Sequence, residues 1–501
     1  MQLSRLLLDA GRSGPAALAG ATVTPAAADP LVSAVVQSHL RVTAGALFVA
    51  RRGATFDAHS LIPAAVAAGA VAVVGERAAT DVDVGDNVAY VQVADSRAAL
   101  PHLAAAFFEH PSRDMAVVGV TGTDGKTTTS YMLHWLLSQH FLTGLISTAG
   151  IRLGTAVLPA EGHFTTPEAT EVQALLARFR AEGVTHVVLE SSSHGFSQHR
   201  LDAIDYDVGV FTNLSSEHLD HHKTWENYRE AKATLLRRSG TGIINADDGE
   251  ADFFSAAARH TDDSGHARSY GMTASADLRI GAVASGGPHL DLEFAIAGER
   301  LAGSLPMPGG YNAYNAAAAL LAAVELGVAP ATAMARFATF PGVPGRMQLV
   351  QERPFMVVVD FAHTPPALAK ALAVVKPPGG RLIVVVGAAG ERDPGKRSGL
   401  GSTAVTGADL AIFTEEDSRS EPVGEILAAM AQGAASRGAV ERQDYLLVPD
   451  RTHAIETALR AAQPGDVVIL AGKGHESTLE RLTETVPWDE VGVVTALLRS
   501  L

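Results

Sequence analysis

A buried strand that runs into a glycine- and threonine-rich loop constrains the fold of this chain more than any other feature. Residues 115–120 are continuously apolar, as expected of a strand covered on both faces of a parallel sheet. The loop 122–125 follows, and a helix is expected over 126–139. Backbone N–H groups of such a loop, together with the helix N-terminus, attract phosphate. Lys126 is then placed to reach the outer phosphates of a nucleotide, and the Thr127 hydroxyl to hold Mg²⁺.

The spacing of this loop departs from the strict phosphate-loop pattern, because five residues separate Gly119 from Gly125. The alternative is an ordinary strand–helix turn with a surface lysine. Loop, lysine and paired threonines coincide between a strand and a helix, which favours phosphate binding. The ATP-binding residues expected here are Gly122, Thr123, Asp124, Gly125, Lys126, Thr127 and Thr128.

Strand and helix patterns alternate along the chain, which indicates an α/β fold with doubly wound parallel sheets. The 501 residues fit three domains at about 100–200 residues each. We expect a small α/β domain at 1–110, a central P-loop-type parallel-sheet ATPase domain at 111–340 and a Rossmann-like domain at 341–501. Residues 341–345 are typical of a linker, and the Gly/Ser/Asp-rich stretch 262–287 of a loop or edge hairpin. Further strands are expected at 47–50, 70–74, 89–93, 186–189, 208–212, 242–245, 356–361, 382–386, 410–414 and 467–470.

Charge and composition exclude several classes of protein. The 39 Lys+Arg against 54 Asp+Glu give a formal charge of −15, which argues against a nucleic-acid coat. The absence of cysteine excludes a disulfide framework, a thiolate zinc site and a cysteine nucleophile. Apolar runs fall short of the roughly 20 residues that span a bilayer, and the N-terminus lacks a secretory pattern. We therefore expect a cytoplasmic protein with no nucleic-acid partner and no membrane insertion.

Three downstream residues are of the types that hold magnesium or a phosphate. Glu190 ends an expected strand, and His218 and Lys232 follow it. Taken singly, each has an ordinary explanation, such as a solvated carboxylate or a lysine on a helix face. The histidines at 218, 221 and 222 suggest zinc, but neither a cysteine nor an H-E-x-x-H pattern supports such a site.

The motifs of this chain resemble those of the Mur ligases, in the same order and over nearly the whole length. Together they are most similar to the muramyl-tripeptide synthetase branch. The motifs are Thr121–Thr128, Glu190–His194, Thr212–Leu214 with His218–Asp220, Ala231–Lys232, Asn312–Asn315, Gly345–Met347, Asp360–Pro365, Arg392–Asp393 and Gly472–Glu476.

The resemblance implies an ATP-dependent amide ligase of peptidoglycan precursor synthesis. Such an enzyme adds a diamino acid to UDP-N-acetylmuramoyl-L-alanyl-D-glutamate through an acyl phosphate. The N-terminal domain would bind the UDP end of that substrate, the central domain ATP, and the C-terminal domain the amino acid. The expected partners are these small molecules, with ATP and Mg²⁺ as cofactors and a monomeric protein.

The resemblance also implies roles for single residues. The catalytic set would be Lys126, Glu190, His218, Lys232 and Arg346. Magnesium would be held by Thr127, Glu190, His218 and Lys232, the last as carbamylated N6-carboxylysine. Asn312, Asn315, Arg346, Asp360 and His363 would complete the ATP site, although Asn312 also fits a helix cap. The muramyl-peptide would contact Ser38, Thr165, Thr166, Ser192, Gln198 and Arg200. Gln37 and His39 flank Ser38 where the family's uridine motif has Asp and Arg.

The amino acid to be added is the least determined feature. Arg392, Gly472 and Glu476 would hold its α-amino and α-carboxyl groups. The stretch 415–421 retains only Arg419 of the Asp-Asn-Pro-Arg pattern of enzymes that add meso-diaminopimelate. Arg419 supports diaminopimelate, whereas Asp417 supports a basic amino acid such as L-lysine or L-ornithine, and the charge argument favours the latter.

Two other functions are consistent with parts of the pattern. One is another ligase of the superfamily, of the folylpolyglutamate or polymer-forming type. The other is a non-catalytic nucleotide-binding paralogue. The segment Thr165–Pro167 with Arg200 argues against the first, and the retained set for phosphoryl transfer argues against the second.

Overall fold

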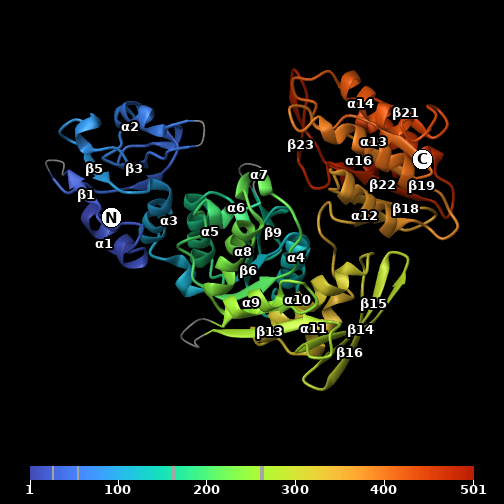
Figure 1. Ribbon diagram of the computed structural model, residues 1–501, viewed down its shortest axis with the longest axis horizontal. Helices are drawn as coiled ribbons and strands as arrows, with labels where there is room; N and C mark the ends of the chain where they lie inside the picture. The colour runs from blue at the N-terminus through green and yellow to red at the C-terminus, as the bar shows by residue number, and fades with distance from the viewer. Residues whose placement is uncertain (25–27, 54–55, 160–164, 260–264) are drawn as a thin grey trace. The chain divides into compact units, whose positions relative to one another are not determined.

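The computed structural model describes residues 1–24, 28–53, 56–159, 165–259 and 265–501. Every strand expected from the sequence overlaps an observed strand, so the α/β class is confirmed (Figure 1). The chain divides into two units. One comprises residues 1–277 with 321–328, and the other residues 278–320 with 329–501.

The N-terminal domain is a five-stranded sheet in the order β1-β5-β4-β3-β2, parallel except for β1. Leu6 of α1 and Leu103 of α3 share a core with Leu47 on one face. Ile62 of α2 packs with Phe48 on the other face. The elements are α1 (Leu3–Ser13), β1 (Thr22–Thr24), β2 (Ala34–Val36), β3 (Ala46–Val49), α2 (Ile62–Ala67), β4 (Ala72–Gly75), β5 (Ala89–Gln92) and α3 (Ser96–Phe107).

The central sheet is parallel from β13 through β12, β11, β6 and β10 to β7, and β8 and β9 add antiparallel strands. Because β6 lies between β10 and β11, the carboxyl ends of all three meet at one edge, where α/β sheets bind ligands. The elements are β6 (Ala116–Thr121), α4 (Lys126–Leu137), β7 (Thr143–Ser147), β8 (Gly150–Leu153), β9 (Ala156–Leu158), α5 (Ala169–Ala181), β10 (His186–Glu190), α6 (Ser193–Ser197), β11 (Tyr206–Phe211), α7 (Leu219–His222), α8 (Trp225–Arg237), β12 (Ser239–Asn245), α9 (Ala251–Ala258) and β13 (His266–Gly271).

The Gly/Ser/Asp-rich stretch 262–287 was expected to form a loop or an edge hairpin, and the structure shows strands and a hairpin there. Residues 262–264 lie outside the described residues. Beyond them, β13 pairs in parallel with β12, and β14 (Leu278–Gly286) forms a hairpin with β15 (His289–Ile296). Exposed and buried residues alternate along β15, the period of a strand with one covered face. β16 (Glu299–Leu305), α10 (Tyr311–Glu325) and α11 (Pro330–Phe337) follow.

The C-terminal sheet has the order β17-β18-β22-β19-β20-β21 and is parallel except for β17. Val357 and Ile383 share one core with Ile455 of α15 and Val494 of α16. Since strand residues alternate between faces, α12, α13 and α14 pack on the opposite side. The elements are β17 (Gln348–Gln351), β18 (Met356–Asp360), α12 (Pro365–Val375), β19 (Leu382–Val386), α13 (Gly395–Gly407), β20 (Leu410–Phe413), α14 (Val423–Ala435), β21 (Tyr445–Leu447), α15 (Arg451–Ala461), β22 (Val467–Ala471), β23 (Thr478–Glu480), β24 (Thr485–Pro487) and α16 (Glu490–Ser500).

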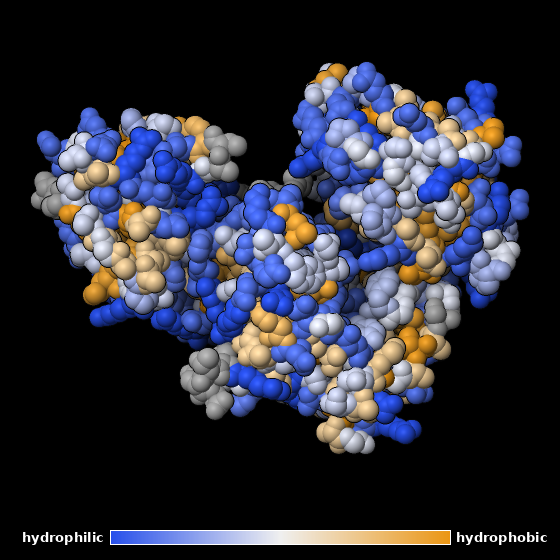
Figure 2. All heavy atoms as spheres, in the orientation of Figure 1, coloured by the Kyte–Doolittle hydropathy of each residue, from blue (hydrophilic) through white to orange (hydrophobic). Residues whose placement is uncertain are grey.

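The face of the molecule in Figure 2 is mostly hydrophilic, with apolar residues in small scattered groups. Among the helices formed by the described residues, none is both long and apolar enough to cross a membrane.

Two glycines let α13 and α14 approach each other closely. A Cβ on Gly401 would overlap the carbonyl oxygen of Met430, and a Cβ on Gly433 would overlap that of Ser398. Both obstacles are backbone atoms, which cannot rotate away. The contact therefore requires glycine at both positions.

We expect Gly433→Ala to weaken this helix pair, with a loss of about 1–3 kcal/mol from overpacking. Gly424→Ala in the same helix is the matched control, because nothing lies within 4 Å of its Cβ position. Hydrogen exchange of amides in α13 and α14 measures the local opening free energy. Equal protection in the two variants would contradict the close contact.

Candidate active site

The segment after β11 packs closely against the loop 122–125 and fixes its backbone conformation. Gly122 and Gly125 have φ of 146° and 84°, in the region that favours glycine. A Cβ on Gly122 would overlap the hydroxyl of Thr212. The amide of Thr123 donates to the Asn213 carbonyl at 2.8 Å. The result is a glycine-lined turn at a helix N-terminus, which suits a phosphate.

Two lysine side chains converge on one carbonyl oxygen of this loop. Lys126 Nζ donates to the Gly122 oxygen at 3.1 Å, and Lys232 Nζ donates to the same oxygen at 2.5 Å. Lys232 comes from α8, is 1% exposed and lies 4.6 Å above the Tyr228 ring. Burial, reinforced by the charge of Lys126, lowers the pKa of Lys232 well below its usual value. The buried amine is thereby shifted towards its neutral form.

The Glu190 carboxylate at the end of β10 is surrounded by donors. It is 1% exposed, and the Thr127 hydroxyl lies 3.0 and 3.1 Å from its two oxygens. Ser147 Oγ donates to Oε2 at 2.5 Å, and the Thr148 amide at 2.9 Å. A fixed carboxylate beside a threonine hydroxyl is an oxygen donor set that fits Mg²⁺.

His218 precedes α7 with φ of 55° and is exposed. Its ring is 4.7 Å from that of His194 and 6.3 Å from that of Tyr228, measured between centroids. Although much of the side chain is exposed, desolvation of part of the ring lowers the pKa of His218 below its usual value, which favours the neutral imidazole that a metal binds.

Four of the residues expected to bind the muramyl-peptide are connected by hydrogen bonds. Thr166 Oγ1 donates to the Glu190 carbonyl at 3.1 Å and lies 2.9 Å from Ser192 Oγ. Arg200 donates to the Thr166 carbonyl at 2.8 Å and to the Gln198 side chain at 2.7 Å. This cluster therefore joins directly to the strand end that carries Glu190.

Glu168 belongs to the same cluster but was not singled out in the sequence. Its carboxylate lies 3.2 Å from the Arg200 guanidinium and 2.9 Å from that of Arg51 in the N-terminal domain. The only sequence signal was its position next to Thr165–Pro167. Ser38 precedes a short 3₁₀ turn in the N-terminal domain, and among the described residues no hydrogen bond links its side chain to this cluster.

The residues expected at the adenosine end lie in the second unit. On α10, Asn312 Nδ2 donates to the Pro308 carbonyl at 2.7 Å, and Asn315 Nδ2 to Asn312 Oδ1 at 2.9 Å. Asp360 at the end of β18 accepts the amides of Met347 and Ala362, both at 2.8 Å. Burial raises the pKa of Asp360.

Phe361 brings two more expected residues together. The Arg346 guanidinium lies 4.6 Å above its ring, and His363 Nδ1 is 2.9 Å from its carbonyl. A Cβ on Gly345 would overlap the backbone of Gly474. The motif that carries Arg346 therefore packs against the motif that carries Glu476 within the C-terminal domain.

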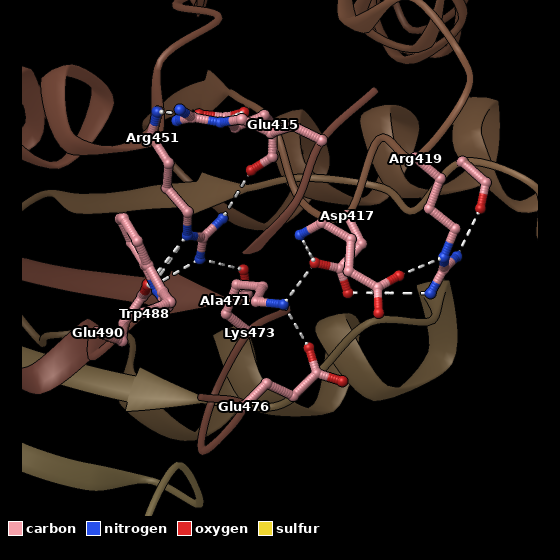
Figure 3. Close-up of polar contacts among 12 residues, drawn as sticks. Glu415, Asp417, Arg419, Arg451, Ala471, Lys473, Glu476, Trp488 and Glu490 are labelled. Atoms are coloured by element: carbon pink, nitrogen blue, oxygen red, sulfur yellow. Dashed lines mark hydrogen bonds and ion pairs between the residues drawn. The ribbon is translucent and has the colours of Figure 1, made fainter. Parts of the chain in front are cut away.

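Alternating charges connect the residues expected to bind the amino acid (Figure 3). Lys473 is fully buried, and its Nζ lies 2.8 Å from Asp417 Oδ1 and 2.7 Å from Glu476 Oε2. Arg419 donates to Glu480 Oε2 at 2.7 Å and to the Gly390 carbonyl, also at 2.7 Å. We refer to these five charged residues, Asp417, Arg419, Lys473, Glu476 and Glu480, as the charge cluster.

The two acids before Asp417 face other groups. Glu415 is paired with Arg481 at 2.6 Å. Glu416 is buried, which raises its pKa, and its Oε2 has no hydrogen-bond partner among the described residues. A Cβ on Gly472 would lie 2.6 Å from that oxygen, and the φ of 108° at this position favours glycine. Arg392 is exposed.

Sequence reasoning missed Lys473 and Glu480 as members of the charge cluster. Lys473 lies inside the quoted motif Gly472–Glu476, which was the available signal. Glu480 lies on the short strand β23 and carries no motif.

Family models match three parts of the chain. They are described as the Mur ligase family catalytic domain at residues 40–108, the Mur ligase middle domain at 120–323, and the Mur ligase glutamate ligase domain at 345–474. The chain thus has the three-part architecture of this family, while the boundaries at 110 and 340 remain predictions.

Full-length relatives agree with these matches. The chain is 45% identical over 492 residues to the UDP-N-acetylmuramyl-tripeptide synthetase of Deinococcus radiodurans, covering 94% of this chain and 95% of that protein. The protein of the same name from Roseiflexus sp. is 40% identical, over 94% of this chain and 96% of that protein. A solved structure of a UDP-N-acetylmuramoyl-L-alanyl-D-glutamate–2,6-diaminopimelate ligase superposes with a TM-score of 0.66 at 30% identity, over 94% of this chain and 95% of that one. Sequence, fold and motif order therefore agree that the chain belongs to the Mur ligase family.

Proposed function

We propose that this protein is the ATP-dependent ligase that adds a diamino acid to UDP-N-acetylmuramoyl-L-alanyl-D-glutamate. The observation that carries the proposal is the convergence of Lys126, Lys232 and the Thr127–Glu190 pair on the loop after β6. A nucleotide-binding protein without catalysis has no need of a buried carboxylate and a second lysine there. The names of the full-length relatives support the same substrate.

The reaction requires two transfers. The terminal carboxylate of the substrate attacks the γ-phosphorus of ATP, forming an O–P bond as the bond to the ADP oxygen breaks. The amine of the diamino acid then attacks the acyl carbon, releasing phosphate and a proton. The first step brings anions together, so cations must neutralise the γ-phosphoryl group. We assign this role to Lys126 and Arg346.

Magnesium would be held by Thr127, Glu190 and His218, and when bound it neutralises charge on the phosphates. We assign Lys232 as N6-carboxylysine, formed when the neutral amine adds CO₂ and loses a proton. The burial that lowers the pKa of this amine favours that reaction. Carbamylation replaces a cation with an anionic oxygen ligand, which suits magnesium.

Lys232→Ala should lower kcat about 10–100-fold, the range for loss of a group that tunes a metal site. Formate or acetate should restore part of the activity by occupying the space of the lost carbamate. Lys376→Ala, at an exposed position in the C-terminal domain, serves as the control. Full activity in Lys232→Ala would remove carboxylysine from the mechanism.

Ser147→Ala should raise the Mg²⁺ concentration needed for half-maximal activity, because Glu190 loses a charge-assisted hydrogen bond. The cost to the folded state is about 1.5–3 kcal/mol. Thr148→Ala is the matched control, since Thr148 contacts Glu190 through its backbone amide. Magnesium titrations of phosphate release compare the two variants, and identical curves would contradict the role of Ser147.

The charge cluster favours a basic amino acid. Asp417, Glu476 and Glu480 carry three negative charges, against two positive charges on Lys473 and Arg419. The guanidinium of Arg419 already pairs with Glu480, so the second carboxylate of diaminopimelate would have to displace that acid. A side-chain ammonium meets a net negative site instead. We therefore propose L-lysine or L-ornithine as the substrate, with Arg392, Gly472 and Glu476 at its α-amino and α-carboxyl groups.

The ratio of kcat/KM for lysine, ornithine and meso-diaminopimelate tests this proposal directly. Glu480→Gln should move the ratio towards diaminopimelate by releasing Arg419. Glu484→Gln, which changes an exposed acid on the adjacent turn, should leave it unchanged. A wild-type preference for diaminopimelate would contradict the proposal.

Phosphate release from ATP separates the main proposal from its alternatives. We expect release only when both the UDP-linked dipeptide and a diamino acid are present. Release with a folate substrate and glutamate would indicate the folylpolyglutamate type. Nucleotide binding without turnover would indicate a non-catalytic paralogue.

A further inference from the structure

Three histidines from two short helices meet beside the proposed active site. His194 lies in α6, and His221 and His222 lie in α7. One possible ligand atom of each lies within 4.8 Å of those of the other two. Their ring centroids are 4.3, 4.8 and 5.4 Å apart. Only His221 and His222 are neighbours in sequence, so the folded chain creates the group.

The surroundings of these rings match those of a ligand set. Ser193 Oγ lies 3.1 Å from His222 Nε2, and Ser197 Oγ lies 3.0 Å from His221 Nε2, so hydroxyls orient two of the rings. In the described part of the chain, no carboxylate forms an ion pair with any of the three. Outer hydrogen bonds of this kind fix the orientation of metal-binding imidazoles.

A surface hollow of about 420 Å³ borders His221 and His222, and Ser197 also lines it. Such a space leaves room for water as a further ligand. Three nitrogen ligands with one open position suit Zn²⁺, Co²⁺ or Ni²⁺. Magnesium, by contrast, prefers oxygen, so this group differs in chemistry from Thr127 and Glu190.

We propose that His194, His221 and His222 form a transition-metal site. Zn–N bonds are about 2.0–2.1 Å long, so the three nitrogens must draw closer on binding. Rotation of imidazoles on the short helices α6 and α7 supplies that movement.

Metal at this site would connect α6 to α7. His218 precedes α7 and contacts His194, so the same metal would restrain the residue to which we assign a magnesium ligand. A ligand that binds only the folded state stabilises it by an amount that rises with the logarithm of the ligand concentration once that concentration exceeds Kd. Binding of a transition metal at this site would therefore reduce the mobility of the segment that carries His218.

Titration of the full chain with Co²⁺, in the presence of saturating Mg²⁺, tests the proposal. Co²⁺ bound by imidazoles gives a visible absorption band, which Zn²⁺ should remove by displacement. We expect one Co²⁺ per chain, and an affinity at least about 10-fold weaker in His221→Gln and in His194→Gln. His140→Gln, at an exposed position on the same unit, is the matched control.

Glu190→Gln separates this site from the proposed magnesium site and should keep the band. Metal-free unfolding midpoints of all variants show that each is folded, and added Zn²⁺ should raise the midpoint of the wild type but not of His221→Gln. Equal Co²⁺ affinity in wild type and both histidine variants would overturn the proposal. Loss of the band in Glu190→Gln alone would also overturn it, by placing Co²⁺ at the magnesium site.

Discussion

The carbonyl oxygen of Gly122 connects two residues of the proposed active site, because the Nζ atoms of Lys126 and Lys232 both donate to it. Lys126 approaches from the helix that the loop begins, and Lys232 from α8. The second amine is buried beside the first, an unfavourable position for two cations in a low dielectric. Loss of a proton relieves this repulsion, and addition of CO₂ would reverse the charge. One backbone oxygen thus orients the lysine to which we assign the carbamate.

The sequence predicted this part of the molecule well because its signals are local. A strand covered on both faces is a continuous apolar run, and the run before the loop became β6. Glu190 was expected at a strand end and lies there. Parallel strands place their carboxyl ends at one edge, so Thr127 and Glu190 meet although 63 residues separate them. For the Gly/Ser/Asp-rich stretch, composition left a loop and an edge hairpin open, and the structure forms the hairpin of β14 and β15.

Side-chain partners across long separations were beyond the same reasoning. Asp417 and Lys473 are 56 residues apart, and Arg419 and Glu480 are 61 apart. The pairing of acids with cations depends on the positions of β20 and β22 in the sheet and on the position of β23. The histidines illustrate the same limit, because sequence spacing grouped His218 with His221 and His222, whereas the fold adds His194 from another helix.

A run of acidic residues in the sequence is consequently a poor guide to the charge that a ligand meets in the folded protein. Three acidic residues are adjacent at 415–417, but each has a different environment in the folded chain. Glu415 is neutralised by Arg481, burial raises the pKa of Glu416, and Asp417 is paired with Lys473. The charge cluster keeps one net negative charge only because two further acids, Glu476 and Glu480, join it from outside that stretch. In the selectivity that we propose, Glu480 matters most, because it pairs with the guanidinium that a second substrate carboxylate would need.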